Sequence, residues 1–139
     1  MQVDAGTLLI LEGNVLVRKV ARNMNPAIWK EPPIPYGKGI SWKVALSKKP
    51  AIYHDLSHVE IASAVVGKEF HSLITVPLVA RDQVLGVMSI FTRAERQFSK
   101  EDLDYLVAAS NQAALAILSI QSSKLLEENK ERMKELEAL

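Results

Sequence analysis

The sequence predicts an α+β fold. It comprises an antiparallel sheet of five or six strands with helices on one face, the loops of a ligand pocket on the other, and a long C-terminal helix. Two adjacent runs, 72–80 and 84–92, are apolar on both alternating faces, and strands of that kind must be covered on both sides. The segment 23–38 holds four prolines, which block helix interiors and remove backbone donors. Residues 99–139 contain neither proline nor glycine, so nothing in the sequence interrupts a helix there.

The chain opens with a predicted hairpin. Apolar runs at 7–11 and 15–20 are separated by Glu12-Gly13-Asn14, and Gly-Asn is a hairpin signal because both residues tolerate a positive φ. The proline-rich segment that follows is expected to be an irregular loop, with one helical turn at 27–30.

A short helix and a short strand come next. Residues 39–48 fit an amphipathic helix that Pro50 ends, and 51–54 fit a strand. Residues 55–70 are ambiguous, because the apolar positions from 59 to 66 suit a loose helix that Gly67 could stop.

The two apolar strands are joined by Arg81-Asp82-Gln83 and form the centre of the predicted sheet. Because both of their faces must be covered, we expect helices on one face and the proline-rich and crossing loops on the other. The loop-covered face is the expected place for a ligand pocket.

The last helix is predicted to begin at Ser99. The hydroxyl of Ser99 can accept from the backbone N–H near Asp102, which sits at the capping-box position where Glu is usual. A stripe rich in small residues is expected to lie on the sheet: Leu103, Leu106, Val107, Ser110, Ala113, Ala114 and Ile117.

The distal part of this helix carries a heptad-like seam of Leu126, Asn129, Met133 and Leu136, with Leu115, Ser119 and Ser122 in the same register upstream. The seam favours a parallel helical homodimer, and the alternative is a solvated helix end. We therefore expect a sensory domain at 1–118 and a helical, coiled-coil extension at 119–139.

Composition narrows the classes of function. A formal net charge of +1 gives no basis for a nucleic-acid or membrane-surface partner, and no uninterrupted apolar run approaches the ~20 residues that span a bilayer. The absence of cysteine excludes disulfides, thiolate metal sites, cysteine nucleophiles and thioether-linked cofactors. No cofactor is expected, and a cytoplasmic setting fits these features.

Three spaced motifs carry a resemblance to a known family: GKGISWKVALSKKPAIYHD (37–55), GKEFHSLITVPLVARDQVLGVMSIFTR (67–93) and QFSKEDLDYL (97–106). Their order resembles the GAF domain, a small-molecule-sensing module of signalling proteins with a PAS-like sheet. The resemblance implies that Asp55 and Ser72 lie near the wall of the pocket. Some GAF-fold proteins reduce methionine sulfoxide with cysteines, which this chain lacks.

Aromatic side chains complete the expected ligand site, since they offer flat apolar surface, although core packing explains any single one as well. The candidate ligand-binding residues are Trp29, Tyr36, Trp42, Tyr53, Asp55, Phe70 and Ser72. His54 and His58 have a spacing that could chelate a metal on a helix, but a strand is expected to end at His54, so no metal site is predicted.

The function that these features favour is a non-catalytic sensory domain. It would bind a small cytoplasmic molecule and pass the signal through a dimeric C-terminal helix to an effector in a longer parent protein. The resemblance implies a histidine kinase of a two-component system, a cyclic-dinucleotide enzyme or a transcriptional activator as that effector. The alternative is a ligand-free dimerisation module with a filled pocket, and an enzyme ranks third.

Overall fold

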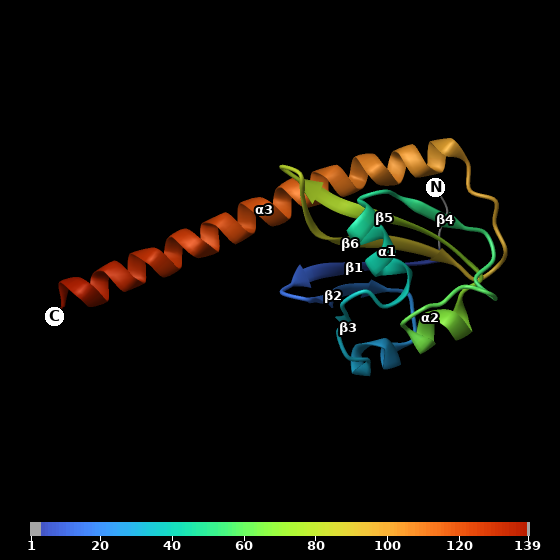
Figure 1. Cartoon of the computed structure of the whole chain (residues 1–139), viewed down its shortest axis with the longest axis horizontal. Coiled ribbons are helices and arrows are strands. Elements are labelled where there is room, and N and C mark those ends of the chain that lie inside the picture. Colours follow the sequence, from blue (N-terminus) through green and yellow to red (C-terminus); the bar gives the residue numbers. More distant parts are fainter. Residues whose placement is uncertain (1–3, 139) are drawn as a thin grey trace.

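The structure is a computed structural model that describes residues 4–138, and its core is a six-stranded antiparallel sheet with the strand order β3-β2-β1-β6-β5-β4 (Figure 1). The elements in chain order are β1 (Ala5–Glu12), β2 (Val15–Arg22), a 3₁₀ helix (Pro26–Lys30), β3 (Ile34–Pro35), α1 (Gly39–Ser47), β4 (Ala51–Tyr53), α2 (Ala64–Glu69), β5 (Ser72–Ala80), β6 (Gln83–Thr92) and α3 (Lys100–Glu137).

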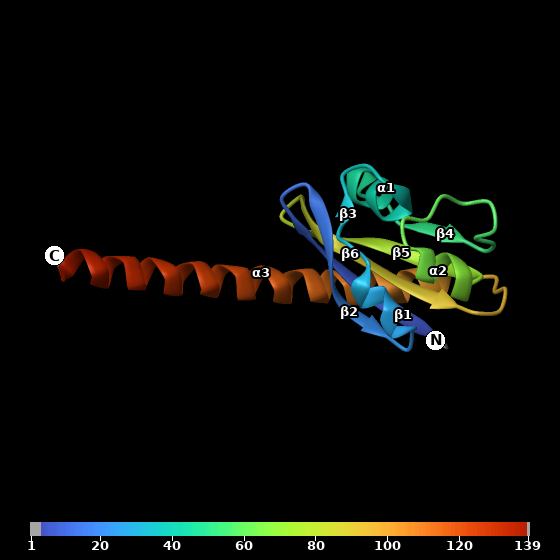
Figure 2. The ribbon, with the colours of Figure 1, turned by 90° about the horizontal axis from the view of Figure 1, so that it is seen from below.

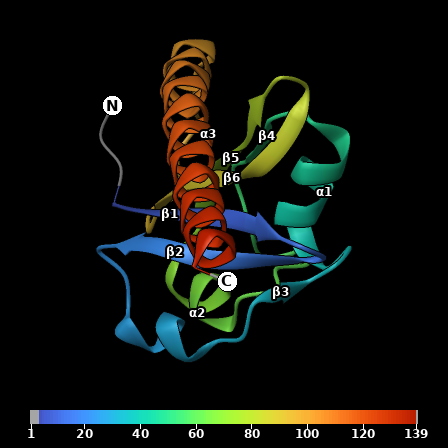
Figure 3. The ribbon, with the colours of Figure 1, turned by 90° about the vertical axis from the view of Figure 1, so that its left-hand side faces the viewer.

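The sheet is covered on both faces, as its apolar central strands require. Helix α3 lies on one side of the curled sheet, and α1 and α2 lie on the other (Figure 3). The sequence predicted helices on one face of the sheet and only loops on the other, and the structure differs on the second face. The loop-covered face also contains α1 and α2, which are short helices within the segments that cover it.

Alternation along β5 and β6 assigns their side chains to the two faces. Leu73 and Phe91 belong to the cluster packed beneath α1 and α2, whereas Ile74 and Val76 pack with Leu106 of α3. The same two strands thus form the floor of the loop-covered face and the surface that supports α3.

Helix α3 begins at the predicted capping box. The Ser99 hydroxyl accepts from the Asp102 N–H at 3.1 Å, and the Asp102 carboxylate accepts from the Ser99 N–H at 3.0 Å. Leu106, Ser110 and Ala114 are its buried residues, so the predicted sheet-facing stripe is confirmed. Beyond the sheet the helix projects as a single straight rod (Figures 1 and 2).

By length and composition, α3 is a candidate membrane span. The sequence analysis did not identify it, because its apolar residues do not form one uninterrupted run. One 18-residue window has a mean hydropathy of 1.3, and 17% of that window is buried in the structure. Helices that cover the core of a protein can share this length and composition, and the buried residues of α3 pack against β1, β5 and β6.

Two local expectations differ from the structure. Gly67 does not stop a helix, because α2 begins only at Ala64, where the Ser63 hydroxyl accepts from the Val66 N–H, and Gly67 lies inside it. The link between β5 and β6 is also tighter than expected. Gln83 belongs to β6, and Arg81 and Asp82 alone form the turn, with φ of +52° and +63°.

Candidate functional site

An inner cavity lies between the sheet and the cover formed by α1, α2 and the proline-rich segment. Its volume is about 30 Å³. Most of its wall is apolar and comes from both the sheet and the cover. The lining residues are Thr7, Leu9, Arg18, Ile28, Ile34, Ile40, Ser41, Ile61, Ala62, Ser63, Val66, Leu73, Ser89 and Phe91.

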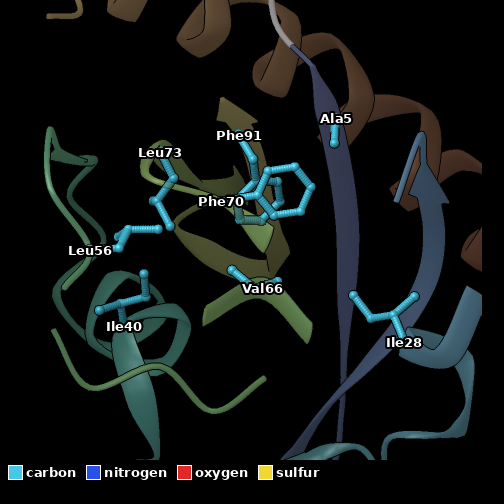
Figure 4. Packing of buried hydrophobic residues seen from close by; sticks show 8 residues of the cluster. All are labelled: Ala5, Ile28, Ile40, Leu56, Val66, Phe70, Leu73 and Phe91. Atoms are coloured by element: carbon cyan, nitrogen blue, oxygen red, sulfur yellow. The ribbon is translucent and has the colours of Figure 1, made fainter. Parts of the chain in front are cut away.

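The cavity is closed by a tightly packed apolar cluster (Figure 4). Ile40 of α1, Val66 of α2 and Ile28 of the 3₁₀ helix come from the cover, and Leu73 and Phe91 come from the sheet. Because these side chains meet across the gap between cover and sheet, little free volume remains. A water molecule needs about 10–15 Å³ of such space, so the cavity has room for one or two.

Arg18 is the charged residue among the side chains that line this cavity. A bulge in the pairing of β1 and β2 leaves Lys19 unpaired between Arg18, opposite Leu9, and Val20, opposite Leu8. Alternation along β2 places Arg18 on the same inner face as the buried Leu16, and Lys19 in the bulge is exposed. Only 7% of the Arg18 side chain is accessible to solvent.

The surroundings of the Arg18 guanidinium are only partly polar. Its Nη1 donates to the Ile28 carbonyl at 3.1 Å, and its Nη2 lies 3.8 Å from Glu31 Oε2. Its buried Nε has no hydrogen-bond partner among the described residues. Burial lowers the pKa of Arg18 below its ordinary value, and the Glu31 carboxylate opposes that shift.

Glu31 links the proline-rich segment to α2. Its Oε1 accepts from the Val65 N–H at 3.0 Å, next to the Ser63 cap of the same helix. A second, more open cavity of about 260 Å³ lies outside this link and shares Ile34, Ala62 and Ser63 with the wall of the inner cavity. Glu31 lines this outer cavity, so its contact with Val65 lies near the wall that the two cavities share.

None of the seven residues predicted to bind ligand is among the described residues that line the inner cavity. Trp42 and Tyr36 lie together instead, with ring centroids 4.9 Å apart, in an open groove of about 530 Å³ between α1 and the hairpin turns. Trp42 is buried and its Nε1 donates to the Ile34 carbonyl at 3.0 Å, so it anchors α1 to β3.

The other five predicted residues are spread over the cover and the sheet edge. Phe70 is buried against Phe91 at 5.0 Å between ring centroids, and Tyr53 is half-buried against the same cluster. Ser72 is fully buried, and its hydroxyl donates to the His54 carbonyl and accepts from the Arg96 N–H. Two residues point away from the core: Trp29 and Asp55.

The histidines lie apart from the cavity wall. His54 Nδ1 lies 3.0 Å from the Arg96 carbonyl, and His71 Nε2 lies 3.8 Å from Asp55 and 3.9 Å from Glu95. Hydrogen bonds from Ser57 are the main cause that lowers the pKa of Asp55. No group of three metal-ligating side chains occurs in the described part of the chain.

Sequence reasoning missed Arg18. The signal that could have found it is the broken alternation in VLVRKV, residues 15–20, where two adjacent charges interrupt an apolar strand. Adjacent residues of a regular strand point to opposite faces, so one charge of such a pair is placed inside. In the structure Arg18 takes the inner position and Lys19 the exposed one.

The chain belongs to the GAF domain family, because a profile of the GAF domain matches residues 1–118. No match was found among curated protein sequences.

Solved structures of GAF domains share the fold. The GAF domain of a phosphoenolpyruvate-protein phosphotransferase from Coxiella burnetii is 17% identical, with a TM-score of 0.78 over 87% of this chain and 75% of that chain. The GAF domain of a two-component sensor histidine kinase from Bacillus halodurans is 16% identical, with a TM-score of 0.72 over 87% and 85%.

An enzyme is also among the similar structures. The type II free methionine-R-sulfoxide reductase from Thermoplasma acidophilum is 20% identical, with a TM-score of 0.70 over 81% of this chain and 77% of that chain. At these identities the likeness extends to the fold alone, and function must be argued from the residues of this chain.

Proposed function

We propose that this chain is a non-catalytic sensory domain that binds a small cytoplasmic molecule beneath α1 and α2 and passes the event to an effector through α3. Two neighbours are domains of a sensor histidine kinase and of a phosphotransferase, which supports a signalling role. A histidine kinase, a cyclic-dinucleotide enzyme or a transcriptional activator remains the expected class of effector.

The observation that carries this proposal is that β5 and β6 serve both sides of the domain. Ser89 and Phe91 lie on the cavity wall, and between them Ile90 packs on the α3 side. The Ser89 hydroxyl also donates to the buried Thr75 hydroxyl at 2.8 Å, which ties the two strands together. A ligand that shifts these strands would therefore displace the surface on which α3 rests, and packed interfaces transmit such shifts because they deform in discrete steps.

Helix α3 supplies the output. It contains no break between the buried Leu106 and the exposed Leu126 and Leu136, so movement at the sheet reaches the far end through one rigid element. The exposed seam at Leu126, Met133 and Leu136 would pair with its copy in a parallel homodimer.

The alternative is a dimerisation module whose pocket is filled by side chains. The inner cavity of about 30 Å³ favours it, since drug-sized ligands occupy pockets of ~300–1,000 Å³. The two readings differ in whether the cover opens for a ligand.

Catalysis is the weaker alternative. A free methionine-R-sulfoxide reductase is among the similar structures, and this chain has no cysteine to supply a thiol. Incubation with free methionine-R-sulfoxide and a reductant is expected to give no turnover, and enzymatic turnover would contradict the non-catalytic assignment.

A thermal-shift screen of nucleotides, amino acids and organic acids tests the sensory proposal. A compound that binds only the folded state at one hundred times its Kd stabilises it by about 2.7 kcal/mol, which raises Tm by several degrees. A uniformly flat screen would instead support the filled-pocket module.

A further inference from the structure

The chemistry around Arg18 indicates what kind of molecule the inner cavity would take. A guanidinium carries five N–H donors, and burying it without partners is costly. Here the Ile28 carbonyl occupies Nη1 at 3.1 Å, whereas the buried Nε lacks a hydrogen-bond partner among the described residues. The edge formed by Nε and Nη2 is therefore the part of the guanidinium with spare donors.

Glu31 does not complete this site. Its carboxylate lies 3.8 Å from Nη2, which is beyond hydrogen-bonding distance, and its other oxygen is committed to the Val65 N–H. It offsets part of the charge of Arg18 while leaving the donors of the open edge without an acceptor. A carboxylate matches that edge, since its two oxygens can accept two parallel N–H bonds from one guanidinium.

We propose that the inner cavity receives the carboxylate of a small organic acid, with Arg18 as its charged partner and Glu31 as the internal group that it displaces. This inference rests on the proposed sensory function. The rest of the ligand would lie among Ile28, Leu73 and Phe91, and Ser41 lines the same cavity.

Binding requires the cover to move, because the closed cavity holds only one or two water molecules. The link to be broken is the 3.0 Å contact between Glu31 and the Val65 N–H, at the boundary with the outer cavity. When a ligand carboxylate pairs with Arg18, Glu31 loses its cationic partner, so ligand entry and release of α2 favour each other.

The first test compares isosteres of different charge on the unmodified chain. Melting temperatures are measured at equal ionic strength with sodium butyrate, butyramide, butylammonium chloride and inorganic phosphate. We expect butyrate to raise Tm, and the amide and the ammonium ion to leave it unchanged. The inference is overturned if the amide matches butyrate, or if phosphate stabilises the protein and butyrate does not.

The second test locates the anion. Arg18→Met is expected to weaken butyrate binding about tenfold or more, the loss that accompanies removal of a charge-assisted hydrogen bond. Arg22→Met is the matched control, since it removes the same charge from an exposed position of the same strand. Unchanged butyrate affinity in Arg18→Met would exclude this site.

Arg18→Met could lose butyrate binding merely because it unfolds, so a second variant, Glu31→Gln, is expected to change binding in the opposite direction. The amide oxygen can still accept from the Val65 N–H, while the charge that competes for Arg18 is gone, so butyrate should bind several-fold more tightly. Equal or weaker binding would contradict the displacement. The wider thermal-shift screen separates the two proposals. If a neutral compound binds and carboxylates do not, only the carboxylate inference fails. If no compound binds at all, both the carboxylate inference and the sensory proposal fail.

Discussion

At the scale of the residue, two glycines show how differently the same substitution acts. A Cβ on Gly86 would collide with the Leu9 carbonyl oxygen of β1, the strand that pairs with β6 at this position. A Cβ on Gly67 would meet nothing within 4 Å, and Gly67 lies inside α2.

We therefore expect opposite effects from these two substitutions on the free energy of unfolding. Gly86→Ala should destabilise the domain by about 2 kcal/mol or more through displaced strand pairing. Gly67→Ala should stabilise it by about 0.5–1 kcal/mol, since alanine restricts the unfolded chain and favours helix. Urea unfolding followed by circular dichroism measures both, and the same sign for the two would contradict the packing described.

Trp42 provides a prediction that separates anchoring from ligand binding. Trp42→Phe keeps an aromatic ring in the core but leaves the buried Ile34 carbonyl without its indole donor. The expected loss of stability is about 1–3 kcal/mol. Affinity for any ligand of the inner cavity should remain within a few-fold, because Trp42 does not line that cavity. A large loss of affinity at unchanged stability would instead show that Trp42 takes part in ligand binding.

The aromatic residues explain why the wall of the cavity was not predictable from composition. A tryptophan or phenylalanine side chain serves a core as well as it serves a ligand, and Trp42 and Phe70 serve the core. The cavity wall is made instead of small and aliphatic residues, which carry no distinguishing chemistry in a sequence. Arg18 is the exception, because two adjacent charges at positions 18 and 19 leave open which of them lies on the inner face.

At the scale of the element, the start of α3 is held by a capping box whose strength depends on pH. The N–H of Ser99 is the main cause that lowers the pKa of Asp102 below its ordinary 3.8, and Arg96 contributes to the same shift. A lowered pKa in the folded state means that the charged carboxylate stabilises the fold above that range, and that this contribution is lost as pH falls through it.

Asp102→Asn should therefore be less stable than the parent at pH 7, with a difference that shrinks as pH falls below about 4. Asp104→Asn is the control, because it removes an exposed carboxylate from the same turn without breaking the capping box. Urea unfolding of the parent and of both variants, at pH 7 and below about pH 4, measures these differences in the free energy of unfolding. A difference that is constant with pH would mean that the charge of Asp102 does not contribute to the cap.

Secondary structure was the most predictable level. Periodicity, prolines and the Ser99 cap predicted the type and order of most elements, because each acts through local backbone chemistry, but β3 within the proline-rich segment was not predicted. The segment 55–70 was the least predictable, since α2 owes its start to Ser63 and to the tertiary contact between Glu31 and Val65.

The distal half of α3 carries the prediction of dimerisation. Replacing Leu126, Met133 and Leu136 with Lys places like charges along the exposed seam and removes its apolar contacts. Sedimentation equilibrium should show weaker self-association, while circular dichroism shows that the domain stays folded.

A matched variant controls for added charge. Ile120→Lys, Gln121→Lys and Ala138→Lys together add the same charge at two exposed positions of α3 and at its exposed C-cap, all outside the seam, and this variant should associate like the parent. If the seam variant associates as tightly as the control, the seam is not the dimer interface.

At the scale of the whole molecule, the inner cavity and α3 lie on opposite faces of one sheet. Strands β1, β5 and β6 separate the cavity from α3, and the adjacent residues Leu73 and Ile74 of β5 pack on opposite faces. Neither surface can change its packing without affecting the strands that support the other. The family and fold were predictable from spaced motifs, whereas the closure of the cavity depends on how side chains from separate elements meet.

Coupling between the cavity and α3 is tested most directly by titrating the ¹⁵N-labelled chain with the screened compound that raises Tm most. The amide chemical shifts are followed during the titration. We expect perturbations at Arg18, Ser63 and Ser89 on the cavity wall and, with the same concentration dependence, at Ser110 and Ala114 of α3 on the far face of the sheet. Perturbations confined to residues off the cavity wall, or a cavity that responds while α3 does not, would contradict a sensor that signals through this helix.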